Sequence, residues 1–111
     1  MQQSFDLFFV SSNYHKYQEA KKILHSFGIC LGFFKYDLEE IQSSSLNEIA
    51  SKKAVQAFQK CKKPIIVEDD GLFIDSLYGF PGPYSSYVFK TIGNKGILQL
   101  LKQNRKAKFV S

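Results

Sequence analysis

The sequence is poor in cysteine, and it has no apolar segment long enough to cross a membrane. Its 111 residues include 2 cysteines, Cys30 and Cys61, which form neither a CxxC pair nor a group with nearby histidines. Disulfide scaffolds and zinc sites use denser patterns, so we interpret both as reduced, structural cysteines. The N-terminal MQQSFDLFFV lacks the basic start of a signal peptide, and no run approaches the roughly 18 apolar residues of a membrane span. We therefore expect a soluble, cytoplasmic protein without a membrane partner.

Acidic residues are absent after Asp75, although the formal net charge of the whole chain is only +5. The cations of this C-terminal part are Lys90, Lys95, Lys102, Arg105, Lys106 and Lys108. A basic tail could bind nucleic acid or polyphosphate, but lysines are also common on solvated surfaces. Nucleic-acid binding is therefore the least favoured function for this chain.

Strand patterns alternate with helix patterns along the chain. Continuous apolar runs predict strands at residues 6–10, 29–36 and 64–67, and helical periodicity predicts helices at residues 15–27 and 46–61. Ser45, with Glu48 three residues later, is the expected capping box of the second helix. We further expect an extended segment at 72–77, a rigid turn at 79–83, a short helix from Pro83, a last helix capped by Asn94, and a strand at 107–110.

This alternation predicts an α/β fold with a mixed central sheet and flanking helices, formed by residues 1–111 as a single domain. The final strand-like AKFV leaves two interpretations open. It can be an ordinary edge strand, or it can be the start of a larger domain of which this chain is a truncated form.

A polar loop, SSNYHK, connects the first predicted strand to the first helix. Ligands of open α/β sheets bind beyond the carboxyl ends of strands, and the N–H groups and dipole at a helix start favour anions. Lys16 adds positive charge in the first turn, so the loop is a candidate phosphate site. Simple capping of the helix by Ser12 or Asn13 is the alternative.

Two acidic segments follow the next strands. In EDDG, residues 68–71, adjacent carboxylates become favourable when a divalent cation neutralises them, and Mg2+ takes oxygen ligands while keeping waters and phosphates in its shell. Gly71 would let the backbone approach a ligand closely. An acidic turn in solvent is the alternative. The second segment, DLEEIQ at residues 37–42, could reach the same sheet edge, and the three loops together predict a metal-assisted phosphoanhydride site.

Four segments resemble the inosine triphosphate pyrophosphatase family: FVSSNYHKYQEAKKIL, LEEIQ, KKPIIVEDDGLFIDSLYGFPGPYSSYVF and TIGNKGILQLL. The resemblance runs from about Phe9 to the end of the chain. It implies an elongated α/β fold, a homodimer, and the Mg2+-dependent hydrolysis of inosine, xanthosine and deoxyinosine triphosphates to the monophosphate and pyrophosphate.

The resemblance also implies roles for individual residues. It places substrate binding at Ser11, Ser12, Asn13, Lys16 and Asp70, and it matches Glu19 to a glutamate of the first helix. Glu40 and Asp69 match the metal ligands, and Asp69 is also the implied proton acceptor. Asp70 departs from the family, which usually has a serine there, and Ser12 replaces the usual glycine.

The family residues that hold and select the purine base have no counterpart in residues 1–111. The resemblance therefore implies a metal and phosphate site without the base-selecting part. The alternative function is a truncated, non-catalytic domain that binds nucleotide phosphates or self-associates through its sheet edge.

Overall fold

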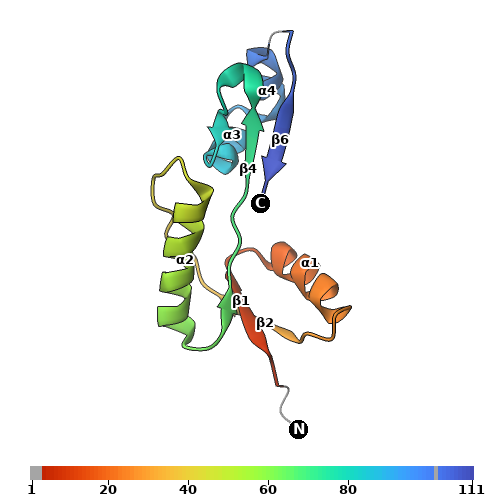
Figure 1. Ribbon diagram of the computed structural model, residues 1–111, viewed down its shortest axis with the longest axis vertical. Helices are drawn as coiled ribbons and strands as arrows, with labels where there is room; N and C mark the ends of the chain where they lie inside the picture. Colours follow the sequence, from red (N-terminus) through yellow and green to blue (C-terminus); the bar gives the residue numbers. More distant parts are fainter. Residues whose placement is uncertain (1–3, 102) are drawn as a thin grey trace. The chain divides into compact units, whose positions relative to one another are not determined.

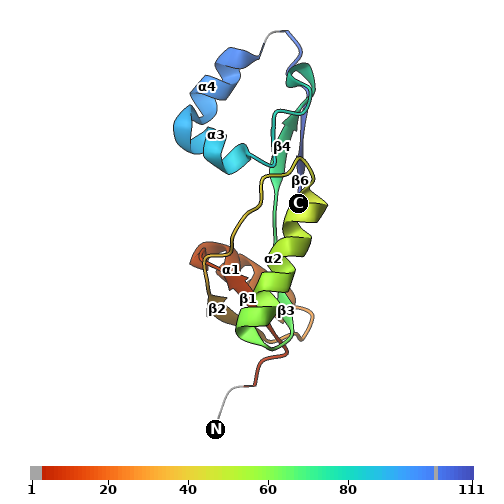
Figure 2. The same ribbon diagram turned by 90° about the vertical axis from the view of Figure 1, so that its left-hand side faces the viewer.

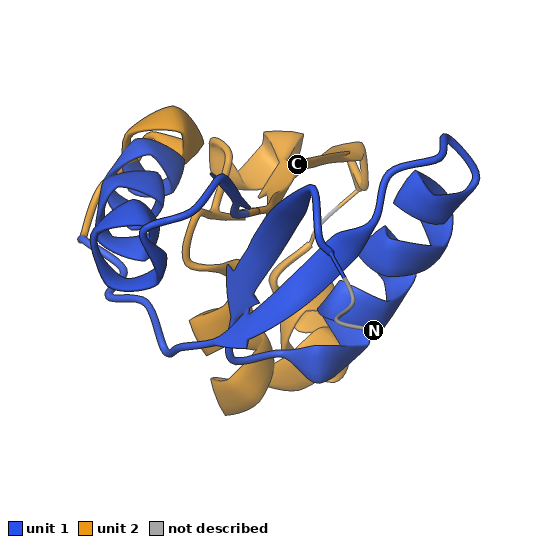
Figure 3. Cartoon of the chain, turned by 90° about the horizontal axis from the view of Figure 1, so that it is seen from below, with its two compact units in different colours: residues 1–41, 49–67 blue, residues 42–48, 68–111 orange. Residues whose placement is uncertain are grey.

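The computed structural model describes residues 4–101 and 103–111. The chain forms two compact units, one of residues 1–41 and 49–67 and the other of residues 42–48 and 68–111 (Figure 3). The expectation that residues 1–111 are a single domain stays a prediction.

The first unit is built on a parallel sheet with strand order β2-β1-β3 (Figure 1). Its strands are β1 (Leu7–Ser11), β2 (Leu31–Lys35) and β3 (Ile65–Ile66). The register pairs Ser11 with Lys35 and Phe9 with Ile66. Because the strands are parallel, their carboxyl ends meet at one edge of the sheet, where α/β proteins bind ligands.

Two helices, α1 (Tyr14–His25) and α2 (Leu46–Cys61), lie on opposite sides of this sheet (Figures 1 and 3). On the α1 side, Phe9, Tyr17 and Leu31 form a buried cluster, and the Tyr17 hydroxyl donates a hydrogen bond to the Leu31 carbonyl oxygen at 2.9 Å. Strand side chains alternate between faces, so Val10 points to the other side. Its 1% exposure shows that this face is covered as well.

The second unit contains an antiparallel sheet with strand order β5-β4-β6. Its strands are β4 (Gly71–Ile74), β5 (Pro81–Gly82) and β6 (Ala107–Val110), and a 3-10 turn, η1 (Asp75–Leu77), follows β4. Helices α3 (Ser85–Thr91) and α4 (Gly93–Leu100) lie on one side of the sheet (Figure 2). Ile74, Val88 and Ile97 form the buried cluster between sheet and helices.

The predicted α/β class is confirmed, with strands of both orientations flanked by helices, and these strands form separate parallel and antiparallel sheets. The prediction that Asn94 caps the last helix is wrong. Ile92 ends α3 and also caps α4, so α4 begins at Gly93 and Asn94 lies within it. The predicted extended segment ends at Ile74, and the short helix begins at Ser85 rather than Pro83. The Lys102 end of the predicted last helix lies outside the described residues.

Within the described part of the chain, no helix is long and apolar enough to cross a membrane.

Candidate functional site

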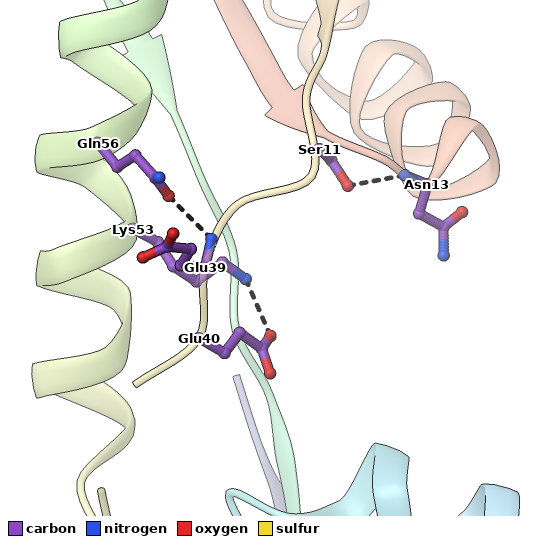
Figure 4. A network of polar contacts seen from close by, with 6 residues as sticks. All are labelled: Ser11, Asn13, Glu39, Glu40, Lys53 and Gln56. Carbon is purple, nitrogen blue, oxygen red and sulfur yellow. Dashed lines mark hydrogen bonds and ion pairs between the residues drawn. The ribbon is translucent and has the colours of Figure 1, made fainter. Parts of the chain in front are cut away.

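The loop between β1 and α1 is organised by side chain to backbone hydrogen bonds (Figure 4). The Ser11 Oγ accepts from the Asn13 N–H at 2.9 Å, as Figure 4 shows. The Asn13 Oδ1 accepts from the Lys16 N–H at 3.2 Å. Asn13 is therefore the N-cap of α1, which confirms the capping interpretation for this residue. Ser12 is exposed and is not the cap.

Capping leaves this loop able to bind an anion. Asn13 uses only its side-chain oxygen for the cap, and its amide group has two further donors. The Ser12 hydroxyl is exposed, and Lys16 is half-buried in the first turn of the helix. Together with the positive end of the α1 dipole, these groups make a cluster of donors suited to a phosphate.

Glu40 lies on the loop that follows β2, and this loop is fixed at two places. The Tyr36 N–H donates to the Ser11 carbonyl oxygen at 3.1 Å, which holds the start of the loop beside the end of β1. Further along, the Glu39 N–H donates to the Gln56 Oε1 of α2 at 2.8 Å (Figure 4). The backbone next to Glu40 is thus tied to a helix of the same unit.

The Glu40 carboxylate forms an ion pair with Lys53 of α2, with 3.4 Å between Oε1 and Nζ (Figure 4). The Glu40 side chain is 56% exposed, whereas that of Lys53 is 12% exposed. A cation can therefore reach the carboxylate from solvent, in competition with the lysine. No local sequence pattern indicated Lys53 or Gln56, because they lie 13 and 17 positions along the chain from the residues they contact.

The acidic segment of Glu68, Asp69 and Asp70 follows β3 in the chain and belongs to the second unit. All three residues are half-buried, and the Asp69 Oδ2 is shielded from solvent. This burial disfavours the interpretation of a solvated acidic turn. Asp69 and Glu40, the two implied metal ligands, belong to different units.

Gly71 lies close to the backbone of β5, and its expected role as a point of close ligand approach stays a prediction. A Cβ atom at this position would lie 2.5 Å from the carbonyl oxygen of Gly82 and 2.9 Å from its carbonyl carbon. The missing side chain thus makes room for the backbone of β5. The packing of two strands is therefore sufficient to require glycine here.

The donor chemistry suits a magnesium ion. Among residues 4–101 and 103–111, no group of three or more His, Cys, Asp or Glu side chains is arranged to hold a metal. Mg2+ is commonly bound through one or two carboxylates, with waters and substrate phosphates in the remaining positions. Glu40 and Asp69 offer hard oxygen donors of this kind.

Known proteins are similar to this chain over nearly all of its length. Residues 7–111 match the sequence model of the Ham1 family. The chain is 53% identical over 105 residues to a dITP/XTP pyrophosphatase of Methanopyrus kandleri, covering 93% of this chain and 56% of the relative. It is 47% identical to a dITP/XTP pyrophosphatase of Hyperthermus butylicus, covering 91% of this chain and 54% of the relative. The chain thus spans about half the length of these curated relatives.

Solved structures share its fold. A nucleoside-triphosphatase, or dITP/XTP pyrophosphatase, of Mycobacterium abscessus superposes with a TM-score of 0.66 at 21% identity, covering 93% of this chain and 61% of the other. The Ham1 protein of Staphylococcus aureus gives a TM-score of 0.59 at 23% identity, covering 92% of this chain and 59% of the other. With the match over residues 7–111, these findings show that the chain belongs to the Ham1 family.

Proposed function

We propose that this chain carries the phosphate-binding and proton-accepting residues of a nucleoside triphosphate pyrophosphatase. Its reaction would convert inosine, xanthosine and deoxyinosine triphosphates to the monophosphate and pyrophosphate. The observation that carries the proposal is the anchored loop Ser11–Lys16, with its cluster of donors, in a chain 53% identical to a dITP/XTP pyrophosphatase. As the resemblance implies, we extend the proposal to a homodimer in the cytoplasm.

The phosphate chain would be held by the Ser12 hydroxyl, the Asn13 side-chain amide and the Lys16 ammonium. These donors come from one short loop whose backbone is fixed by the Ser11 and Asn13 hydrogen bonds. Fixed donors need little reorganisation when a charged substrate binds, which favours binding in a defined orientation.

As the resemblance implies, Glu40 and Asp69 are the proposed ligands of Mg2+. When bound, the ion would supply positive charge that polarises the phosphoanhydride. Asp69 would accept a proton from the water whose oxygen attacks the α-phosphorus, and pyrophosphate would leave.

Asp70 adds a carboxylate where the family usually has a serine. Next to a triphosphate its charge would repel the substrate unless the metal ion screens it. We propose that Asp70 contacts the substrate side of the site and makes substrate binding more dependent on Mg2+ than a serine would.

The test is pyrophosphate release from inosine triphosphate and from ATP in the presence of Mg2+. We expect release from inosine triphosphate, and we expect the Asp69→Asn variant to lose it. A rate above that with ATP would indicate that this chain also selects the base. Asp75→Asn is the matched control, because Asp75 is an exposed aspartate of the same unit. If the folded chain releases no pyrophosphate, or if Asp69→Asn is as active as the control, the proposed function is refuted.

A further inference from the structure

The lysine that ends β2 lies beside the start of the candidate phosphate loop. β2 runs next to β1 (Figure 1), and the parallel register pairs Lys35 with Ser11, the last residues of the two strands. Neighbouring strands are about 4.8 Å apart. The Tyr36 N–H donates to the Ser11 carbonyl oxygen at 3.1 Å, so the pairing continues to the very end of both strands. The backbone of Lys35 is therefore fixed one strand away from the loop that leads to α1.

The Lys35 side chain lies on the face of the sheet that α1 covers. Side chains alternate along a strand, so Leu31, Phe33 and Lys35 share one face. Leu31 is buried with Tyr17 of α1, and the Phe33 ring stacks on the Tyr17 ring with 4.8 Å between their centroids. The Phe33 ring also meets the ring of Tyr14, the first residue of α1, at 5.5 Å. Lys35 continues this row toward the carboxyl edge of the sheet, where α1 begins.

The charges around Lys35 are suited to an anion. Lys35 is exposed, and within residues 4–101 and 103–111 no carboxylate forms an ion pair with its ammonium group. Lys16 and the positive end of the α1 dipole lie at the same loop. Positive charges that gather at one place repel one another, and an anion bound among them removes this repulsion. A phosphate on the loop would therefore interact favourably with Lys35.

We propose that Lys35 is a further phosphate-binding residue, whose ammonium group contacts the phosphate chain held by the loop Ser11–Lys16. This inference rests on the proposed function, and Lys35 is not among the substrate-binding residues that the resemblance implies. A lysine ammonium is a compact charge on a long, flexible stem. It can therefore reach the loop from the neighbouring strand and pair with phosphate oxygens without a fixed geometry.

The probe is inorganic tripolyphosphate, which is the phosphate chain of a nucleoside triphosphate without sugar or base. Its binding is measured by isothermal titration calorimetry in the absence of Mg2+. Lys35→Met removes the charge and keeps most of the stem, and it should weaken binding by about twofold to fivefold, the effect of one exposed ion pair. Lys35→Arg keeps the charge and should bind like the parent protein. The difference between Lys35→Met and the parent should shrink as salt is added.

Two further variants calibrate the measurement. Lys22→Met removes the same charge from an exposed position in the last turn of α1, at the other end of the helix from the loop. It is the matched control and should leave binding unchanged. Lys16→Met removes the lysine of the loop itself, and it should weaken binding whether or not Lys35 takes part. Circular dichroism checks that each variant keeps the fold of the parent protein.

The outcomes separate this inference from the proposed function. If Lys16→Met weakens binding but Lys35→Met binds like Lys22→Met, the role of Lys35 is refuted while the phosphate loop stands. If Lys35→Met and Lys22→Met weaken binding equally, the effect is one of net charge and the role is refuted as well.

Two other outcomes concern the loop and the reaction. A parent protein that does not bind tripolyphosphate would overturn the loop, and the role of Lys35 with it. If the parent binds tripolyphosphate and only Lys35→Met and Lys16→Met are weakened, the role of Lys35 is supported even when no pyrophosphate is released from inosine triphosphate. That last result would refute the hydrolysis alone.

Discussion

Replacing Gly71 with alanine is expected to destabilise the second unit by about 1–3 kcal/mol, the usual range for overpacking. The new Cβ would lie 2.5 Å from the Gly82 carbonyl oxygen, and an ordinary contact begins at 3.4 Å, so the atoms must separate by 3.4 − 2.5 = 0.9 Å. Backbone cannot rotate away as a side chain can. Gly82 is also held in place, because its carbonyl oxygen accepts from the Ser85 hydroxyl at 2.5 Å.

The strain should spread from Gly71 to the neighbouring strand pair. The Ser85 Oγ that donates to Gly82 also accepts from the Leu72 N–H at 2.7 Å. Moving Gly82 away from Gly71 therefore weakens the bonds that join β4, β5 and the start of α3. We expect faster amide exchange at Leu72 and Ile74 and unchanged exchange at Leu31 in the first unit.

The free energy of unfolding is measured by urea unfolding. The transition is followed by circular dichroism, because the chain has 0 tryptophans for fluorescence. Ser86→Ala, at an exposed position of α3, is the control and should stay within about 0.5 kcal/mol of the parent protein. If Gly71→Ala also stays within about 0.5 kcal/mol, the close approach of the two strands is not a constraint on stability and the reasoning fails.

Three further predictions concern the first unit. Asn13→Ala should cost about 1 kcal/mol in urea unfolding through loss of the α1 cap, and an unchanged midpoint would contradict this role. Tyr17→Phe should cost about 1–2 kcal/mol in the same assay, because the Leu31 carbonyl oxygen loses its buried donor. Lys53→Met should lower the Mg2+ concentration needed for half-saturation in a calorimetric titration, because the ion no longer competes with the lysine for Glu40. Since Glu40 is 56% exposed, we expect a change of up to about fivefold, and a higher Mg2+ requirement would refute the competition.

Local sequence patterns predicted most of the individual elements because their signals lie within a few residues. The apolar run at residues 6–10 became β1, and Ser45 caps α2 by accepting from the Glu48 N–H at 3.2 Å. The capping box is not reciprocal, however, because the Glu48 carboxylate accepts from the Ser43 hydroxyl at 2.9 Å. The hydrogen-bond partner of the Glu48 carboxylate depends on the loop conformation, and the S-x-x-E spacing does not specify it.

The division of the strands into two sheets could not be predicted in this way. β6 pairs with β4, although α3 and α4 lie between these two strands in the chain. No local pattern specifies that pairing or its register. Asn94 failed as a cap for a related reason. The direct junction of α3 and α4 at Ile92 is a tertiary feature, and it overrides the local preference of asparagine for cap positions.

In the candidate site, too, contacts between residues far apart in the chain could not be predicted from local patterns. Its residues Ser11–Lys16 and Glu40 follow strand ends, so their position at the sheet edge was predictable. The partners of the Glu40 loop were not, because Lys53 and Gln56 lie on a helix 13 and 17 positions from the residues they contact. The close packing of Gly71 was not predicted, because its neighbour Gly82 is brought to it only by the pairing of β4 and β5.

The central position of β1 has a consequence for how this protein can evolve. The strand is paired on both edges, with β2 and with β3, and its side chains alternate between two covered faces. Deleting one residue from Leu7–Ser11 would exchange the faces of Phe9 and Val10 and would pull Ser11 back from the edge where the loop begins. A substitution such as serine for glycine at Ser12 has no such effect. We therefore expect lineages of this protein to vary the chemistry of the loop far more readily than the length of the strand that precedes it.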